Sequence, residues 1–235
     1  MSGFLRRAFG ALGNGLKPGL REFLRARAHF HAALPAGPLI AQNYVVFDVE
    51  STGLDVSGGD QVIAIGAVRL RDGEARKSFT TLVNPARTIP PASIRYHGIT
   101  DAMVADAPPA AEALARFQDF IGDDVLVAHN AGFDRALIFA EEFRGAPAIG
   151  NPFLCSLMTS RWLDPEEADH SLDGLCGRAG IVIGGRHQAL GDAEATAALW
   201  VSLIARAAAR GVDDLVELAR RSRMTAAMAA SAEHF

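Results

Sequence analysis

Two carboxylates interrupt an apolar run near the start of the chain. The stretch YVVFDVESTG begins at Tyr44 and places Asp48 and Glu50 among β-branched and aromatic residues that favour a buried strand. Side chains two positions apart on a strand point to the same face, so the two acids lie side by side. Two like charges there are unfavourable unless one is protonated or a cation lies between them. The pair is therefore either a metal site or two acids that reach solvent, and this stretch alone does not separate the two.

Further polar groups stand at the ends of other predicted elements. HNAGFD begins at His129 and ends at Asp134, directly after a short apolar run that predicts a strand. HQALGD begins at His187 and ends at Asp192, at the start of a predicted long helix. Each group has a plainer explanation, such as an acid favoured by a helix dipole or a histidine in a surface loop. Ligand sites in open α/β sheets lie beyond the carboxyl ends of strands, so their joint occurrence favours one site.

The elements that must position these groups predict an α/β fold with a mixed sheet. Three strands come first, and short turns join them, including an Asp-Gly hairpin signal at residues 72–73, so they are antiparallel neighbours. Helices and short strands then alternate. The predicted strands are residues 44–53, 61–70, 77–83, 125–128 and 153–155, and residues 84–109 are predicted to form a long, functional loop. The predicted helices are residues 110–121, 133–143, one ending near 163, one from the Ser171 cap to 179, 189–209 and 212–230.

The first 41 residues are expected to form a basic, partly helical extension and linker. Residues 1–40 hold six basic residues against one acid, whereas the rest of the chain holds 17 against 26. The pattern predicts a poorly ordered start, an amphipathic helix over residues 20–34 and a Pro-Gly linker before Gln42. A basic arm on an acidic domain suggests an electrostatic contact with nucleic acid or a partner, and a solvated face is the alternative.

The composition is that of a globular protein and gives no sign of a membrane protein. Hydrophobic residues make up 49% of the 235 and charged residues 21%, which is ordinary for a globular protein, and the net charge is −4. We expect no membrane span, because no run of about 18 apolar residues exists. Cys155 and Cys176 form no CxxC pattern and suggest a reducing compartment, so we expect a cytoplasmic location. The arginines before the first acid, Glu22, leave an organellar transit peptide open.

At the polar clusters the sequence resembles the DEDD-type 3′→5′ exonucleases, in the histidine branch that includes the proofreading epsilon subunit of bacterial DNA polymerase III. D-x-E-[TS]-T-G matches residues 48–53, H-N-x-x-F-D matches residues 129–134, and H-x-x-x-x-D matches residues 187–192. HGIT from His97 and HSLD from His170 also resemble family stretches. A single match would be weak, but three in order with the right spacing are specific.

The resemblance implies a fold, a reaction and a set of ligands. The fold is a ribonuclease H-like mixed five-stranded sheet flanked by helices, within an exonuclease domain at residues 42–210 followed by a C-terminal helix and tail at residues 211–235. The reaction removes nucleoside 5′-monophosphates from single-stranded or frayed 3′ ends, with single-stranded DNA favoured over RNA. Two Mg²⁺ or Mn²⁺ ions are implied, with Asp48, Glu50, Asp134 and Asp192 as ligands and His187, on a mobile or substrate-closed loop, as general base.

The same resemblance implies contacts to the terminal nucleotide. The implied contact residues are Ser51, Thr52, Gly53, Leu54, His97, Gly98, Ile99, His129, Asn130 and Phe133. His97 is equally explained as a turn residue, and His129 is expected to support the site. The chain departs from the family at Ala64, where relatives often have Glu, and at Cys155-Ser156, where they commonly have Asp-Thr. We expect these departures to tune the site, since neither position is a metal ligand.

Three alternatives stay open. One is an exoribonuclease of the same fold that processes RNA 3′ ends, since the sequence does not show which residues read a 2′-hydroxyl. Another is a non-catalytic nucleic-acid-binding or polymerase-associated domain, against which the complete set of four acids and His187 argues. The third is an acid cluster without a metal. Association with a DNA polymerase is implied by the resemblance, but residues 211–235 contain no Gln-rich clamp-binding peptide, so we expect a stand-alone or loosely associated enzyme.

Overall fold

A five-stranded mixed sheet forms the centre of the molecule. The structure is a computed structural model that describes residues 19–28 and 32–232. The strand order is β3-β2-β1-β4-β5. The strands are β1 (Tyr44–Ser51), β2 (Val62–Arg71), β3 (Glu74–Leu82), β4 (Val125–Ala128) and β5 (Phe153–Cys155). β1, β2 and β3 are antiparallel neighbours, and β4 and β5 run parallel to β1, which confirms the predicted mixed sheet.

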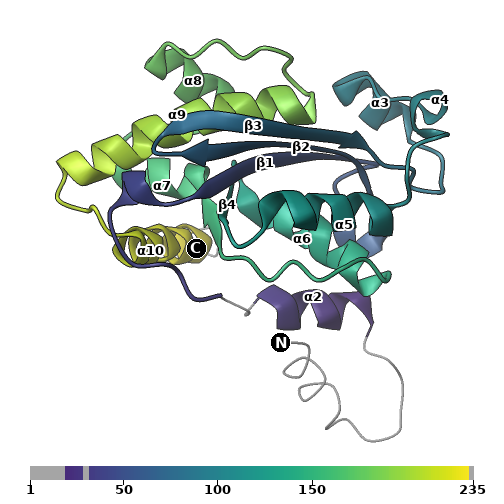
Figure 1. Ribbon diagram of the computed structural model, residues 1–235, viewed down its shortest axis with the longest axis horizontal. Coiled ribbons are helices and arrows are strands. Elements are labelled where there is room, and N and C mark those ends of the chain that lie inside the picture. The colour runs from purple at the N-terminus through teal and green to yellow at the C-terminus, as the bar shows by residue number, and fades with distance from the viewer. Residues whose placement is uncertain (1–18, 29–31, 233–235) are drawn as a thin grey trace, which may run out of the picture.

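Helices cover both faces of this sheet. Figure 1 shows α8 and α9 on one side of the sheet and α5 and α6 on the other. The helices are α2 (Leu20–Ala28), α3 (Pro91–His97), α4 (Asp101–Val104), α5 (Ala110–Ile121), α6 (Ala131–Phe143), α7 (Ser156–Leu163), α8 (Leu172–Ala179), α9 (Ala189–Ala209) and α10 (Leu215–Ala232), with short 3-10 helices η1 (Leu39–Ala41) and η2 (Val56–Gly58). Within the described residues no helix combines the length and apolarity needed to cross a membrane.

Strand β1 has a hydrophobic core on each side because its side chains alternate. Tyr44 and Val46 pack in the core that includes Trp200 of α9, where the Tyr44 and Trp200 rings lie 5.6 Å apart. Val45 and Phe47 pack in the opposite core, beneath α5 and α6. Burying one such large side chain contributes about 1.5–3 kcal/mol, so β1 is held firmly from both sides.

Turn and cap residues account for several element ends. Asp72 and Gly73 have φ angles of 52° and 75°, the paired positive values of a type I′ turn, so β3 begins at Glu74, three residues earlier than predicted. Ser171 caps α8 as predicted, since its Oγ accepts the Gly174 N–H at 3.1 Å. Gly180, with a φ of 68°, ends α8.

The predicted long loop at residues 84–109 is wrong in part, because it contains α3 and α4. Pro91 occupies the first turn of α3, and Gly98 ends the helix with a φ of 75°. Proline at a helix start and glycine just past its end are helix boundary signals, and the same residue types also occur in turns. The helices α6 and α10 also begin at Ala131 and Leu215 rather than at residues 133 and 212.

The basic helix α2 packs on the domain through one of its arginines. Arg27 forms a buried ion pair with Glu142 at 2.8 Å and donates to the Ile149 carbonyl at 3.0 Å. The rings of Phe23 and Phe143 lie 5.4 Å apart. The prediction that the helix reaches residue 34 is wrong, since residues 32–34 are not helical and precede a proline, which disfavours helix. The predicted poorly ordered start and the basic residues before Gly19 lie outside the described residues.

Candidate active site

Asp48 and Glu50 face the side of the sheet that α9 covers. They continue the alternation of Tyr44 and Val46, whose side chains pack in the core beneath that helix. The register between β1 and β2 shifts directly after Glu50, an irregularity of the kind that re-aims side chains beside functional sites. The strand therefore delivers both carboxylates to one edge of the sheet, at its carboxyl end.

A glycine on β2 lets α9 approach these acids. Gly66 pairs with Asp48 across the β1–β2 ladder. A Cβ built at Gly66 would lie 2.2 Å from the backbone of Ala189 and Leu190, which begin α9. Any side chain at this position would push the first turn of α9 away from the sheet. The absence of one brings Asp192, in that same turn, next to the β1 carboxylates.

Asp192 completes a group of three carboxylates. Oxygen atoms from Asp48, Glu50 and Asp192 all lie within 4.8 Å of one another. Asp192 Oδ2 accepts the His187 N–H at 3.2 Å and an Arg186 guanidinium N–H at 2.5 Å. Asp192 Oδ1 is buried and has no hydrogen-bond partner among the described residues. A buried acceptor without a donor, within a compact group of carboxylate oxygens, fits a hard divalent cation such as Mg²⁺ or Mn²⁺.

Asp134 approaches from the opposite layer. Asn130 adopts the left-handed conformation, with a φ of 61°, and turns the chain from β4 into α6. Asp134 then lies in the first turn of α6, where its Oδ1 accepts the Val49 N–H of β1 at 3.2 Å. It is 3% exposed and lines the same cavity as the three other acids. The four predicted acidic ligands therefore converge, although Asp134 is not one of the compact group of three.

The buried acids hold protons more tightly than ordinary carboxyl groups. Burial, followed by the charges of Asp134, Glu50 and Asp192, raises the pKa of Asp48 well above its usual range. Burial and the neighbouring acids raise the pKa of Glu50 to about 8, and burial raises that of Asp134 to about 7. The repulsion that causes part of these shifts is what a bound cation relieves.

The four acids open into a cavity of about 750 Å³. Of the implied contact residues, those that line it are Ser51, Thr52, Gly53, Leu54, His97, His129, Asn130 and Phe133. Gly98 and Ile99 do not line it: Gly98 ends α3, and Ile99 is buried in a small core cluster. Leu54 is 85% exposed at the cavity, whereas Thr52 is fully buried and donates to Asp60 Oδ1 at 2.7 Å. Leu54 is thus placed to meet a substrate, and the Thr52 side chain secures the turn.

His187 reaches the cavity from the loop that precedes α9. Its ring lies 4.1 Å from the Tyr96 ring of α3, and an Arg186 guanidinium N–H donates to its Nδ1 at 3.2 Å. A Cβ at Gly191 would lie 2.1 Å from the Gly184 carbonyl oxygen, so that glycine lets the loop fold back against α9. The mobility predicted for this loop stays a prediction.

Two departures from the family pattern, Ala64 and Ser156, lie directly beside site residues. His129 Nδ1 lies 2.9 Å from Ser156 Oγ, and burial lowers the pKa of His129 to about 4, so this histidine is neutral near pH 7. Ala64 pairs with Glu50 across the β1–β2 ladder. A carboxylate at Ala64 would add another negative charge beside the site, and this chain lacks it.

A match to known proteins accompanies this geometry. The family described as "Exonuclease" matches residues 45–200, a span that contains the four acids and His187. The chain belongs to the exonuclease family. The chain is 45% identical over 185 residues to the "DNA polymerase III subunit epsilon-like protein" of Rhodobacter capsulatus, covering 77% of this chain and 26% of that protein. It is 38% identical over 173 residues to the "DNA polymerase III PolC-type" of Bacillus subtilis, covering 73% of this chain and 12% of that protein. The chain therefore spans a minor part of either relative.

Solved structures agree with the fold of this chain. Exonuclease X in complex with 5′ overhanging duplex DNA matches with a TM-score of 0.61 and 28% identity, over 77% of this chain and 99% of that chain. E. coli Exonuclease I in complex with a dT13 oligonucleotide matches with a TM-score of 0.60 and 18% identity, over 71% of this chain and 42% of that chain. At this lower identity the second match supports the fold alone.

Arg186 lines the same cavity, although none of the sequence motifs names it. Its guanidinium lies between two acids, with ion pairs to Asp192 at 2.5 Å and to Asp173 of α8 at 3.0 Å. The available signal was its position directly before His187, in a chain whose site is otherwise acidic. The arginine offsets part of the negative charge of the carboxylate cluster.

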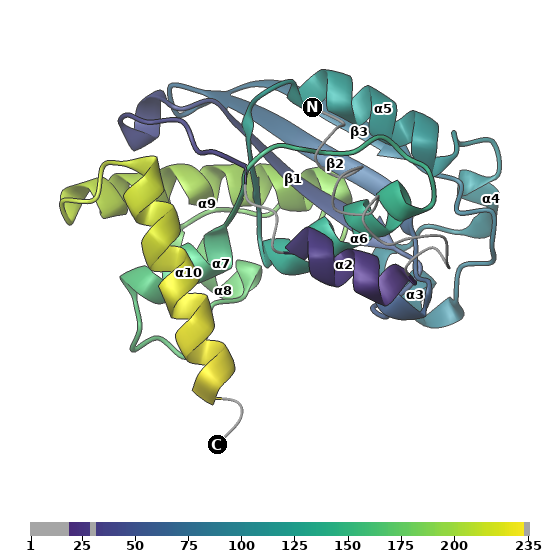
Figure 2. The same cartoon turned by 90° about the horizontal axis from the view of Figure 1, so that it is seen from below.

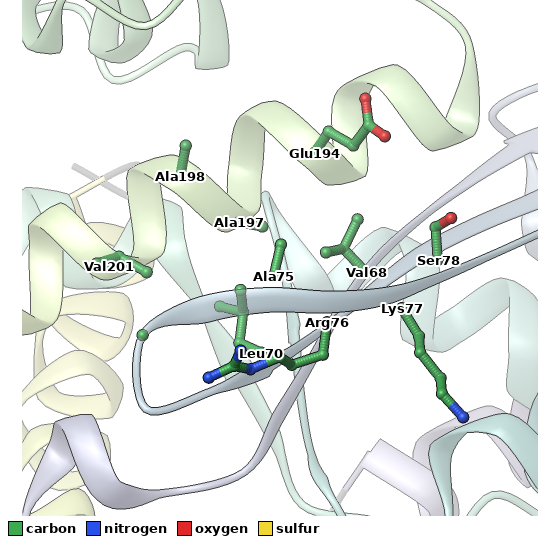
Figure 3. A pocket seen from close by; sticks show the side chains of 11 residues that line it. Val68, Leu70, Ala75, Arg76, Lys77, Ser78, Glu194, Ala197, Ala198 and Val201 are labelled. Atoms are coloured by element: carbon green, nitrogen blue, oxygen red, sulfur yellow. The ribbon is translucent and has the colours of Figure 1, made fainter.

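A different hollow lies between the β2–β3 hairpin and α9, and it contains none of the motif residues. It measures about 650 Å³, between β2, β3 and α9. Figure 3 shows Val68, Ala75 and Ala197 between the hairpin and the helix, with Lys77 pointing away from α9. Its floor is apolar and it holds no group of acids, so it offers no set of metal ligands comparable to the carboxylates of the first cavity.

The raised carboxyl pKa values predict that stability falls with pH when metal is removed. The pKa of Glu50 is about 8 in the folded protein and 4.5 ordinarily, so the folded state binds more protons between these values. The contribution of the Glu50 carboxyl to the stability of the folded protein is complete below pH 4.5 and is lost as the pH rises through 8. In EDTA, the free energy of unfolding should fall with pH more steeply for wild type than for Glu50→Gln. We expect the two slopes, measured by urea unfolding, to differ by at most about 1.4 kcal/mol per pH unit. Equal slopes in the two proteins would contradict the assignment.

Proposed function

We propose that this chain is a divalent-metal-dependent 3′→5′ exonuclease that releases nucleoside 5′-monophosphates from single-stranded or frayed 3′ ends of DNA. The observation that carries the proposal is the convergence of four carboxylates and His187 on one cavity, from β1, α6, α9 and the loop before α9. Neither a non-catalytic binding domain nor a structural acid cluster needs this arrangement.

The residues divide into ligands and a proton acceptor. Asp48, Glu50 and Asp192 would hold one Mg²⁺ or Mn²⁺ ion, and Asp134 would support a second. When bound, such ions supply Lewis-acid stabilisation of the charge that develops at phosphorus and at the attacking and leaving oxygens. Burial of the acids beneath α9 orients their oxygens before the substrate arrives.

His187 would take the proton of the attacking water at Nε2. An arginine is always a donor, so the Arg186 contact to Nδ1 leaves the proton of the neutral ring on Nε2. For Nε2 to accept a proton, Nδ1 must carry the hydrogen, which the Arg186 contact disfavours. We therefore expect His187 and Arg186 to separate when the 3′ end is bound, as a substrate-closed loop would allow.

Exposed side chains at the rim suit a nucleotide end. Leu54 and Tyr96 are 85% and 65% exposed, and both line the cavity. Apolar and aromatic groups hold unstacked bases without strong sequence preference, which suits an enzyme that digests any 3′ end. The names of the relatives support DNA as the substrate and an association with DNA polymerase activity, such as proofreading or repair. We also propose that the protein is located in the cytoplasm.

The test is digestion of single-stranded DNA and RNA of the same sequence. With a 5′ label and Mg²⁺ or Mn²⁺, we expect a ladder of shortened DNA products that EDTA abolishes. A 3′ label should instead appear at once in mononucleotides, which gives the direction. Faster loss of RNA than of DNA would favour the exoribonuclease alternative. If neither polymer is shortened with metal, the proposed function fails.

A further inference from the structure

A second cavity adjoins the catalytic one. It measures about 290 Å³ and is walled by the start of α6, β5, the start of α7 and α10. Asn130 lines both cavities, so the two are neighbours across the turn that enters α6. Groups in the second cavity therefore lie close to whatever occupies the first.

Two arginines from distant parts of the chain face this second cavity. Arg135 follows the acid Asp134 in α6, and Arg223 belongs to α10. The packing of α10 on α7 positions Arg223: Ser222 Oγ lies 3.1 Å from Thr159 Oγ1, and the Arg221 guanidinium lies 5.4 Å from the centre of the Trp162 ring. Figure 2 shows α10 running across α7.

Neither arginine is neutralised by a carboxylate. Among the described residues, Arg135 and Arg223 have no ion pair and no hydrogen bond to an acid, and Arg135 only lies 5.8 Å from the Phe139 ring. The other arginines near Arg223 on α10 do have an acidic partner: Arg220 and Arg221 both pair with Glu217 at 2.7 Å.

The electrostatic surroundings of the pair favour an anion. The two adjacent cavities that both arginines line, of about 290 and 20 Å³, have no aspartate or glutamate in their walls. Burial, and then the positive charge of Arg27, lowers the pKa of Arg135 from its usual value, which is the effect of a cation without a counter-ion. In a chain of net charge −4, such a pair is unusual and suits a phosphate.

We propose that Arg135 and Arg223 bind a backbone phosphate of the substrate strand, on the 5′ side of the nucleotide held at the carboxylates. The inference rests on the proposed function and extends it from the reacting end to the strand that follows. The strand is the occupant that charge and position favour, because it is a chain of phosphates and the second cavity shares Asn130 with the catalytic one. Phe153 and Met158 add an apolar wall beside the arginines, suited to a sugar or base.

The test compares substrates of increasing length. We would measure kcat/KM on single-stranded DNA from a dinucleotide up to about 16 nucleotides, a length that one binding domain commonly covers. For wild type, kcat/KM should rise with the length of the strand, since longer strands reach the arginines. Arg135→Gln and Arg223→Gln should each lower kcat/KM on long strands about tenfold, mainly through a higher KM. This is the size expected for loss of a hydrogen bond to a charged group. Arg135→Lys, which keeps the charge, should retain part of the rise of kcat/KM with length.

A matched control and a binding measurement separate the outcomes. Arg220→Gln removes the same charge from the same helix but outside both cavities, and it should show the wild-type gain with length. In EDTA, the slope of log affinity against log salt for the long strand should fall by about 0.7 for each arginine removed.

Some results would overturn the inference. An active wild type whose gain with length is the same in both Arg→Gln variants would leave the exonuclease assignment standing and remove the strand site. Variants that alter inhibition of dinucleotide cleavage by inorganic phosphate, but not the gain with length, would indicate a small-anion site instead. A wild type that cleaves no strand of any length contradicts the proposed function itself, and the salt slopes in EDTA then test the arginines separately.

Discussion

Replacing Asp48 with asparagine should lower the exonuclease rate by about 10³-fold or more and, in EDTA, raise the melting temperature. The carboxylate has the oxygens of Glu50 and Asp192 within 4.8 Å, so its loss removes a ligand from the centre of the site. Metal stabilisation of the transition state is worth several kcal/mol, which corresponds to a loss of about this size. Without metal, the folded protein must either protonate the buried Asp48 carboxyl or keep its charge beside the other acids, and asparagine removes that cost, so stability should rise.

The two effects have opposite signs, which makes the test specific. Rates would come from the labelled-DNA assay, and melting temperatures from thermal scans with EDTA and with Mn²⁺. Asp123→Asn is the control, because this acid is exposed and has the same charge. We expect the control to match wild type in both measurements. Loss of activity together with a lower melting temperature in EDTA would indicate that Asp48 supports the fold rather than a metal.

Replacing His187 with alanine should lower kcat by about 10²–10⁴-fold, the contribution usual for a general base. KM should change little, because the ring is proposed to act on the attacking water rather than on the strand. The contact with Tyr96, 4.1 Å between ring centres, gives a second explanation that the test must exclude. Added imidazole should restore part of the rate if the missing group is a base.

Tyr96→Ala is the matched variant for that exclusion. It removes the ring that packs on His187 but leaves the imidazole in the chain. If it reduces kcat as much as His187→Ala does, packing rather than proton transfer explains the loss. A His187→Ala rate within about threefold of wild type would remove the general-base assignment altogether.

Local signals predicted much of the fold. The Asp-Gly turn at residues 72–73 specifies a hairpin through two positive φ angles, and Ser171 and Gly180 specify the ends of α8 through short-range hydrogen bonds. These features depend only on neighbouring residues. The same residue types at Pro91 and Gly98 bound the helix α3, but they do not specify it, since proline and glycine also mark turns.

The sequence by itself determined which side chains are available and the order in which they occur. Period-two alternation placed Asp48 and Glu50 on one face of a strand, and the motif spacing named Asp134, Asp192 and His187 as partners. Their meeting depends on contacts between residues far apart in the chain, which short-range patterns do not encode.

Only the tertiary structure decided how closely these groups approach and what charge surrounds them. Gly66 on β2 admits the first turn of α9, and that contact sets Asp192 beside the β1 acids. Docking of α10 on α7 likewise brings Arg223 into one cavity with Arg135. Burial and unpaired charge are properties of the packed molecule, because they depend on which atoms exclude water and which counter-ions lie within reach.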